Sequence, residues 1–385
     1  MTAGRKRLLN AAIVVGVAAI AVAAVVNVVR SDGSAAAPVE PAADAETQPV
    51  DTGGTLPGEL PEILTLPSDL RAEGGVLWWF GTGCGARAVD LSSGLVTRGP
   101  PGTCDLWPSA DGGRAIASVA PDEEGGYGIV PVTYPPSEGE TVFAGEEKID
   151  GALALFTPTA WHPDGKHVAV CEPRDGQIFL DVLDLENGTR GAEVNVGTGG
   201  ITGFCQASFL SDGRLAVVRD GTTVEVDGRD IFGEEDAVRL LPDVSSGTRS
   251  ITALGAGGGL LVVGLRSDVP PAAAIAALRP DGTIVFSAAL RPDVFPAAAG
   301  VAPDGQSLWY LNGTSGAAAI LEIPGGSRSE LYRARWLAWS PDGNYMAAVV
   351  REGIEIISLR NGGRLLTTLD VPADIVTWTE RPREG

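Results

Sequence analysis

The chain holds two histidines, His162 and His167, which stand five residues apart in the stretch AWHPDGKHVAV. Imidazole binds metal ions and exchanges protons near neutral pH, so a closely spaced pair could form a metal site or an acid–base site. A structural role in a turn is the alternative. Copies of this stretch elsewhere in the chain help to distinguish the two.

The Pro-Asp-Gly turn between the histidines recurs along the chain. Where Pro is present it sets φ, Asp can hydrogen-bond its own backbone, and Gly accepts a positive φ. An apolar, β-prone run follows each turn, which predicts a β-hairpin. The other copies are Ser109–Gly112, Leu210–Gly213, Val301–Gly305 and Trp339–Gly343, with Gly255–Gly259 as a degenerate copy.

Alignment of these copies assigns both histidines to repeat positions. The residues that correspond to His162 are Ser340, Ala302 and Leu210, and those that correspond to His167 are Tyr345, Ser307 and Leu215. We therefore interpret the histidines as turn and strand residues. A metal or acid–base site stays the alternative, and we expect no catalytic residue, metal ligand or cofactor-binding residue in the chain.

A second hairpin signal alternates with the first. Its copies are Val89–Gly94, Leu183–Gly188 and Ile357–Gly362, with looser copies at Ala277–Gly282 and Glu322–Gly326. Two hairpins per unit make four strands per unit. The first type of turn recurs every 38 to 53 residues, and periods near 40–45 residues with four strands each indicate β-propeller blades.

The repeat resembles that of the TolB-type, WD-repeat-like propeller family, whose blades carry W-S-P-D-G. The nearest copy in this chain is Trp339–Gly343, and the resemblance covers nearly all of residues 75–385. It implies an all-β fold and a scaffold role in a complex of the cell envelope. The Gly-His and Trp-Asp pairs of true WD repeats are absent from the sequence.

Residues 75–385 are predicted to form seven blades of four antiparallel strands. Blade one lacks one strand and the C-terminus has one left over, so residues 373–379 are expected to pair with residues 76–80 and close the ring. Trp161, Trp339 and Trp378 recur just before the turn position and are predicted to pack between blades. The first strands of blades two to seven are placed at Trp107, Trp161, Ser208, Ile251, Ala298 and Trp336.

Four cysteines, an even number, suggest disulfides in an oxidising compartment. Four cysteines allow three pairings, and the predicted strands favour Cys84–Cys104 and Cys171–Cys205. In each pair one cysteine follows a second strand and the other enters the next blade. A zinc site is the alternative, although the CxxC or nearby-histidine spacing of such sites is missing.

The N-terminus differs from the rest of the chain. Residues 1–7 carry Arg5, Lys6 and Arg7, and residues 8–29 form an uncharged apolar run. A run of about 20 apolar residues spans a bilayer, with its basic flank on the cytoplasmic side. We expect an uncleaved single-pass anchor, with a cleaved signal peptide as the alternative. Residues 30–74, rich in Ala, Pro and acidic residues, are predicted to be a flexible linker.

The remaining residues 61–385 hold 24 basic and 43 acidic residues, a net charge of −19. This charge argues against nucleic acid and anionic lipid headgroups as partners. Three acidic clusters could supply paired carboxylates for glycoside hydrolysis if held about 5–10 Å apart; we interpret them as solvated loop charge. The clusters are Asp122–Glu124, Glu146–Glu147 and Glu234–Asp236.

The sequence therefore predicts a propeller that is anchored in the cell membrane, faces outside the cytoplasm and binds an envelope or membrane protein. The alternative is a propeller enzyme, a hydrolase or lyase, that acts on envelope saccharide or a lactone-like substrate. Motifs of nucleophilic, zinc-dependent or phosphate-binding catalysis such as GxSxG and HExxH are missing from the sequence.

Overall fold

Everything described below in the computed structural model belongs to the unit formed by residues 60–385. The described residues are 63–81, 86–98, 103–109, 111–119, 129–133, 158–175, 177–197, 205–242, 244, 247–269, 272–326, 328–331, 334–360 and 363–380. The predicted cytoplasmic end (1–7) and membrane span (8–29) lie outside them. Within them, neither helix is long and apolar enough to cross a membrane.

The described strands form seven antiparallel sheets, in agreement with the predicted propeller. Six sheets have four strands and the second has three; its fourth strand was expected within residues that are not described. The first sheet contains β1 (Val76–Phe80), β2 (Arg87–Asp90), β3 (Val96–Arg98) and β27 (Ile375–Thr379).

The other sheets take their strands in chain order. The second contains β4 (Thr103–Pro108), β5 (Arg114–Val119) and β6 (Ile129–Thr133); the third β7 (Pro158–Trp161), β8 (His167–Arg174), β9 (Gln177–Asp184) and β10 (Thr189–Gly197); the fourth β11 (Ala207–Phe209), β12 (Leu215–Arg219), β13 (Thr223–Val226) and β14 (Arg229–Phe232). The fifth contains β15 (Arg249–Gly257), β16 (Leu260–Ser267), β17 (Ala273–Leu278) and β18 (Ile284–Leu290); the sixth β19 (Pro296–Val301), β20 (Ser307–Asn312), β21 (Ala317–Glu322) and β22 (Arg328–Leu331); the seventh β23 (Trp336–Trp339), β24 (Tyr345–Val350), β25 (Gly353–Ser358) and β26 (Arg364–Leu369). The predicted first strands of blades two to seven all coincide with observed ones.

Buried side chains between successive sheets form the core. Seven clusters of buried apolar residues join sheet one to two, two to three and so on, and the last joins seven back to one. Strand β1 shows how one strand serves two clusters: Val76 and Trp78 pack toward sheet two, whereas Leu77 and Trp79 pack toward sheet seven. Alternate side chains leave opposite faces of a strand, so a sheet covered on both faces requires an almost uninterrupted apolar sequence, as in VLWWF.

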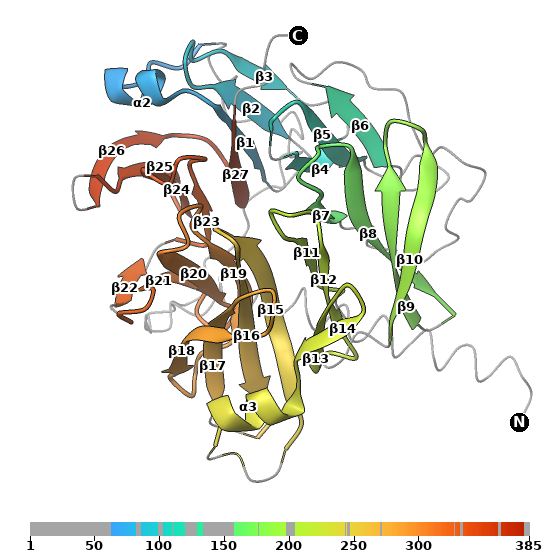
Figure 1. The fold of residues 1–385 in the computed structure, drawn as a ribbon. Helices are drawn as coiled ribbons and strands as arrows, with labels where there is room; N and C mark the ends of the chain where they lie inside the picture. Colours follow the sequence, from blue (N-terminus) through green and yellow to red (C-terminus); the bar gives the residue numbers. More distant parts are fainter. Residues whose placement is uncertain are drawn as a thin grey trace, which may run out of the picture. The chain divides into compact units, whose positions relative to one another are not determined.

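The C-terminal strand closes the first sheet, as predicted. Strand β27 pairs antiparallel with β1, from Val76 opposite Thr379 to Phe80 opposite Ile375, and the two lie side by side in Figure 1 although they come from opposite ends of the described chain. The buried indole Nε1 of Trp78 donates a hydrogen bond to Thr379 Oγ1 at 2.9 Å. Pairing of the two ends gives β1 a hydrogen-bonded neighbour on both sides and leaves β27 as the edge strand of this sheet.

The predicted linker boundary at residue 74 is corrected. Helix α2 (Ser68–Glu73) lies within the predicted linker, and Leu66 and Leu70 are buried against sheets one and seven. Ile63 also forms a β-bridge with Leu95. The acidic, Pro-rich composition that predicted a linker belongs to residues 31–60, and the apolar residues of EILTLPSDL after it are enough to dock this segment.

Of the two predicted disulfides, Cys171–Cys205 is confirmed. It links β8 to the residue that enters sheet four, with Cα atoms 6.0 Å apart, inside the apolar cluster between sheets three and four. Cys84 lies outside the described residues, so the Cys84–Cys104 link stays a prediction.

Thr379→Val removes a hydrogen-bond acceptor from a buried indole in the closing strand. We expect a loss of about 1–3 kcal/mol of unfolding free energy, the cost of leaving a buried donor unpaired, measured by urea denaturation. Thr377→Val, on the same strand and only half buried, is the control and should change stability by less than about 0.5 kcal/mol. Equal effects of the two changes would contradict the importance of the Trp78 contact.

Replacement of Cys171 and Cys205 together by alanine removes a cross-link with a sequence separation of 34 residues. On the chain-entropy model this costs roughly 3–4 kcal/mol, seen as a lower denaturation midpoint than that of the oxidised wild type. Reduction of the wild type with dithiothreitol should lower the midpoint similarly. If neither treatment changed the midpoint, the link would not stabilise the fold.

Candidate functional site

The repeated turns share one hydrogen-bonding pattern. In each turn the aspartate Oδ1 accepts the backbone N–H of the residue two positions on, as sequence analysis predicted; the N···O distances are 3.0 Å at Asp111, 2.8 Å at Asp164, 3.2 Å at Asp212, 2.9 Å at Asp304 and 2.9 Å at Asp342. The degenerate copy forms a turn at Gly258 and Gly259, where both residues have positive φ. The carboxylates thus set the shape of each turn.

Turns of successive sheets pack against one another. A Cβ at Gly165 would lie 3.0 Å from Asp111 Oδ2 of sheet two, and one at Gly213 would lie 2.6 Å from His162 Nε2 of sheet three. A Cβ at Gly258 would meet the backbone nitrogen of Gly305 at 2.3 Å. The turns of sheets two and three, three and four, and five and six therefore approach each other closely.

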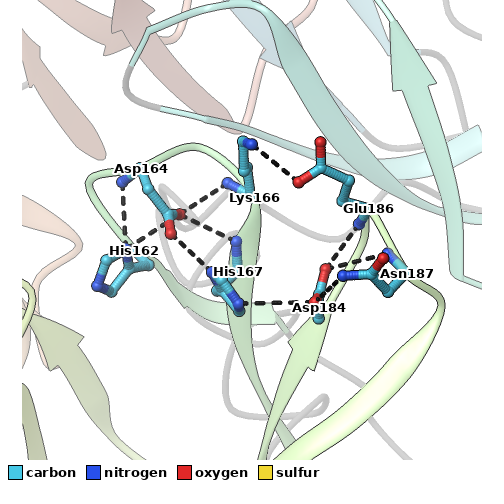
Figure 2. A network of polar contacts seen from close by, with 7 residues as sticks. All are labelled: His162, Asp164, Lys166, His167, Asp184, Glu186 and Asn187. Carbon is cyan, nitrogen blue, oxygen red and sulfur yellow. Dashed lines mark hydrogen bonds and ion pairs between the residues drawn. The ribbon is translucent and has the colours of Figure 1, made fainter.

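The turn between β7 and β8 brings both histidines onto one carboxylate (Figure 2). The Nδ1 atom of His162 lies 3.0 Å from Asp164 Oδ1, and Nδ1 of His167 lies 2.7 Å from Asp164 Oδ2. These three side chains can each direct one nitrogen or oxygen atom into a space where all three atoms lie within 4.8 Å of one another. All three are about one-third exposed, at 29%, 33% and 38% for His162, Asp164 and His167.

A second turn, between β9 and β10, faces the first (Figure 2). Asp184 Oδ2 lies 3.9 Å from His167 Nε2, and Asp184 is held by the backbone N–H groups of Glu186 and Asn187 at 2.9 and 3.1 Å. Lys166 pairs with Glu186 at 2.8 Å, so its ammonium is directed away from the histidines.

Asp164 is strongly biased toward its ionised form. Burial by itself raises the pKa of this carboxyl, but hydrogen bonds from the backbone N–H groups of Lys166 and His167 and the contacts with both imidazoles lower the pKa by more. The net pKa is far below the usual range of aspartate. Hydrogen bonds to the charged form of a carboxyl have this effect, so a fixed negative charge stands between the two rings.

Both histidines occupy turn and strand positions of the repeat, as predicted, but their side chains also make contacts that the prediction did not include. The N–H of His162 donates to the carbonyl of His167 at 2.9 Å, as that of Ser340 donates to Tyr345. Sequence alignment did not reveal that both rings would turn toward the aspartate between them. The spacing H-x-D-x-x-H across a tight turn was the available signal.

The predicted packing of the tryptophans between sheets is confirmed. Trp161 packs between sheets two and three and donates its Nε1–H to the carbonyl of Trp107 at 2.8 Å. Trp339 packs between sheets six and seven, and Trp378 between seven and one.

Sequence analysis missed a pair of carboxyl groups, Glu73 and Asp342. Glu73 ends α2, Asp342 lies in the turn of sheet seven, and their side chains share a hydrogen bond. Arg360 Nη2 lies 3.2 Å from Asp342 Oδ2 and 3.8 Å from Glu73 Oε2. The pair borders a cleft of about 560 Å³, whose other lining residues are Arg71, Ala72, Gly74, Gly75, Ser92, Pro341 and Glu380. Glu73 belongs to the segment that was predicted to be a linker. Its contact with a turn about 270 positions away could not be predicted from the neighbouring sequence.

The two carboxyl groups share one proton. Burial, followed by the hydrogen bond and the charge of Asp342, raises the pKa of Glu73 to about 7. Burial also acts to raise the pKa of Asp342, but its hydrogen bonds from Glu73, Asn344 and Ser340 lower the pKa overall. Two adjacent carboxyl groups commonly titrate as such a pair.

The acidic clusters considered as catalytic candidates are not brought together by the described structure. Residues 122–124 and 146–147 lie outside it. Glu234, Glu235 and Asp236 begin helix α3 (Glu234–Leu240), where Asp236 accepts the N–H of Gly233 at 3.2 Å. Acidic residues at a helix N-terminus favour the helix electrostatically, which explains this cluster structurally.

No family model matches the chain, and no curated protein matches it. Solved structures do. A functionally unknown protein from Desulfotomaculum acetoxidans matches with a TM-score of 0.51, 9% identity, and coverage of 80% of this chain and 99% of that one. An oligogalacturonate lyase in complex with manganese matches with a TM-score of 0.50, 11% identity, and coverage of 72% and 83%. The β-propeller domain of Cps50 (Swd1) from Myceliophteria thermophila gives a TM-score of 0.47 and 13% identity, with coverage of 74% and 91%.

These similarities concern the fold alone, because the identities are so low. The β-propeller architecture of this chain is seen in its own strand order, with seven antiparallel sheets among the described residues. The likeness to the TolB-type family continues to rest on the W-S-P-D-G motif.

Glu73→Gln should stabilise the protein at pH 8 and change its stability little at pH 5. The pKa of Glu73 is raised in the folded state, so the folded protein binds a proton that the unfolded chain releases between about pH 4.5 and 7. Stability therefore falls as pH rises through this window, and a neutral glutamine removes that dependence. Melting temperatures at the two pH values measure the effect.

The control for this prediction is Glu352→Gln, at an exposed position in a turn of sheet seven. It should leave the pH dependence of the melting temperature as in the wild type. A lower melting temperature of Glu73→Gln than of wild type at pH 8 would show that the ion pair with Arg360 outweighs the repulsion from Asp342.

Proposed function

We propose that the chain is a membrane-anchored propeller outside the cytoplasm that binds another protein of the cell envelope. The observation that carries the proposal is the Cys171–Cys205 disulfide. Structural disulfides are characteristic of oxidising compartments outside the cytosol. Together with the basic residues 5–7 and the apolar run 8–29, the disulfide supports the orientation that the positive-inside rule gives.

The proposed linker is shorter than the sequence suggested, because ordered packing begins by residue 63. A flexible chain of the 32 residues 31–62 has an end-to-end distance of roughly 28–34 Å. In this proposal the propeller remains close to the membrane surface and meets neighbours embedded in, or attached to, the same membrane.

A cleft between sheets six and seven is a suitable surface for a protein partner. It has a volume of about 650 Å³ and combines apolar side chains with carboxylates; its lining includes Ile320, Ile323, Trp339, Asp304 and Glu322. The Nε1 atom of Trp339 is buried and, among the described residues, has no hydrogen-bond partner.

The net charge favours some partners over others. Residues 61–385 carry a net charge of −19, which repels nucleic acid and attracts basic protein surfaces. Long-range attraction of this kind speeds encounter and weakens with salt. We therefore propose an envelope protein with a basic contact surface, and no nucleic acid.

An enzyme that acts on envelope saccharide is the second candidate. The observation that favours it is the proton-sharing pair Glu73–Asp342 beside a cleft, because a carboxyl group with a raised pKa can act as a general acid. However, these two carboxyl groups are in hydrogen-bond contact, whereas glycoside hydrolysis places the sugar between carboxyls about 5–10 Å apart. The pair therefore fits a structural role better.

Photo-crosslinking in intact cells tests the binding proposal. Gln306 lines the cleft between sheets six and seven. The full chain with a photoreactive residue in place of Gln306 should crosslink to one defined envelope protein. Capture should decrease as salt is added to spheroplasts. The same residue in place of Asp230, exposed on β14, is the control and should not capture it.

Two results would contradict the proposal. Equal capture of the same protein from both positions would mean non-specific contact. Hydrolysis of envelope saccharide by the purified chain, lost in Glu73→Gln or in a Glu234–Asp236 variant that still folds, would replace the scaffold by the enzyme.

A further inference from the structure

The turn of sheet three carries two histidines at positions that hold other residue types in the corresponding turns. The turn conformation does not require them. The corresponding positions in sheet seven hold Ser340 and Tyr345, and the aspartate hydrogen bond is the same, at 2.9 Å for Asp342 and 2.8 Å for Asp164. Only sheet three carries two imidazoles at these positions. The histidines are therefore additional to what the hairpin needs.

From this arrangement we propose that His162, Asp164 and His167 bind a divalent transition-metal ion, with zinc as the best match. Two imidazoles and one carboxylate form a ligand set that zinc accepts in three-ligand sites. Two ligands of one zinc ion stand roughly 3.4 Å apart when each is about 2.1 Å from it. The N···O distances of 3.0 and 2.7 Å are near this value, so binding needs only small side-chain shifts and the release by His162 Nδ1 of the backbone N–H of Asp164, which it accepts at 3.2 Å.

In each imidazole ring, the surroundings of Nε2 determine that Nδ1 is the nitrogen that faces the proposed metal site (Figure 2). The Nε2 edge of His162 lies against the Gly213 turn, and its ring meets Phe209 edge-on, with centroids 5.0 Å apart. The Nε2 of His167 faces Asp184 at 3.9 Å. This carboxylate favours a proton on Nε2 of His167 and leaves its Nδ1 lone pair for the metal, as in other metal sites with a supporting carboxylate. On His162, Nδ1 accepts the backbone N–H of Asp164 at 3.2 Å, so this ring also turns an Nδ1 lone pair toward the turn.

The surroundings are suited to a cation with open coordination positions. Asp164 supplies the negative charge between the rings, and Lys166 is directed to Glu186 at 2.8 Å. The three side chains are about one-third exposed, so water or a group of another molecule can reach the ion. This proposal does not depend on the proposed partner of the protein.

Zinc titration of the full chain, purified and freed of metal with a chelator, tests the site. The binding of one Zn²⁺ is followed by competition with a chromophoric chelator. The only two histidines in the chain allow both imidazoles to be observed by NMR, and both signals should shift together. Replacement of Zn²⁺ by Co²⁺ should give visible absorption bands from nitrogen and oxygen ligands.

The histidine variants take the residues that stand at the same positions in another turn of the repeat, so that the turn can still fold. His162→Ser and His167→Tyr, which copy sheet seven, should each weaken Zn²⁺ binding by more than about 100-fold, since loss of a mere supporting group costs 10–100-fold. Asp184→Asn should weaken it by about 10-fold. Asp164→Asn should abolish tight binding, whereas its matched control, Asp304→Asn in the sheet-six turn, should leave it unchanged.

Two outcomes would overturn the proposal. One is the same Zn²⁺ affinity in His162→Ser, His167→Tyr and wild type, which would assign binding to the acidic surface. The other is no binding of Zn²⁺ or Co²⁺ by folded wild type, with unshifted histidine signals. In the second case the histidines would serve only to pack the turns of sheets three and four.

Discussion

The pairing of β27 with β1 is the interaction on which the rest of the structure depends. Each sheet here is covered on both faces by its neighbours, so no single sheet can bury its side chains alone. Removal of one junction would expose the apolar faces of two sheets and the long inner edge of one. The backbone ladder from Val76–Thr379 to Phe80–Ile375, with the Trp78 indole bound to Thr379 Oγ1, joins residues that are about 300 positions apart. Loop closure over such a distance is entropically costly, and the apolar cluster between sheets seven and one offsets that cost.

The docked N-terminal segment is part of the same junction. Leu66 and Leu70 are buried among residues of sheets one and seven, so the segment that follows the proposed linker covers the place where the chain ends meet. The proton-sharing pair of Glu73 and Asp342 lies at this junction too. Burial of a carboxyl pair costs free energy unless one member is neutral, and this explains why the pKa of Glu73 is raised while Arg360 compensates the charge of Asp342.

The same turn geometry carries different chemistry in different sheets. The aspartate of each turn is committed to the backbone N–H two residues on, and the flanking positions are free to vary. In sheet seven they hold Ser340, whose hydroxyl accepts the N–H of Tyr345, and Tyr345, whose ring stacks on Trp378; in sheet three they hold the two imidazoles. A repeated scaffold can thus acquire a ligand site by two substitutions without a change in backbone, because the backbone conformation is already satisfied by aspartate and glycine.

The sequence by itself determined the strand-and-turn pattern, the number of repeats, the inter-sheet tryptophans, the closing strand and the Cys171–Cys205 pair. Each of these follows from the recurring turns and from the apolar, β-prone runs beside them, which the chain displays in consecutive residues. Only the tertiary structure decided that residues 63–74 dock, that Glu73 meets Asp342, and that both imidazoles of one turn face Asp164 while Asp184 of another supports them. These contacts depend on the direction of side chains and on the approach of distant segments, and of them only the facing imidazoles had a signal in the sequence, the spacing H-x-D-x-x-H. The physical reason is that a turn fixes its own backbone locally, whereas the groups that surround its side chains are brought there by the packing of whole sheets.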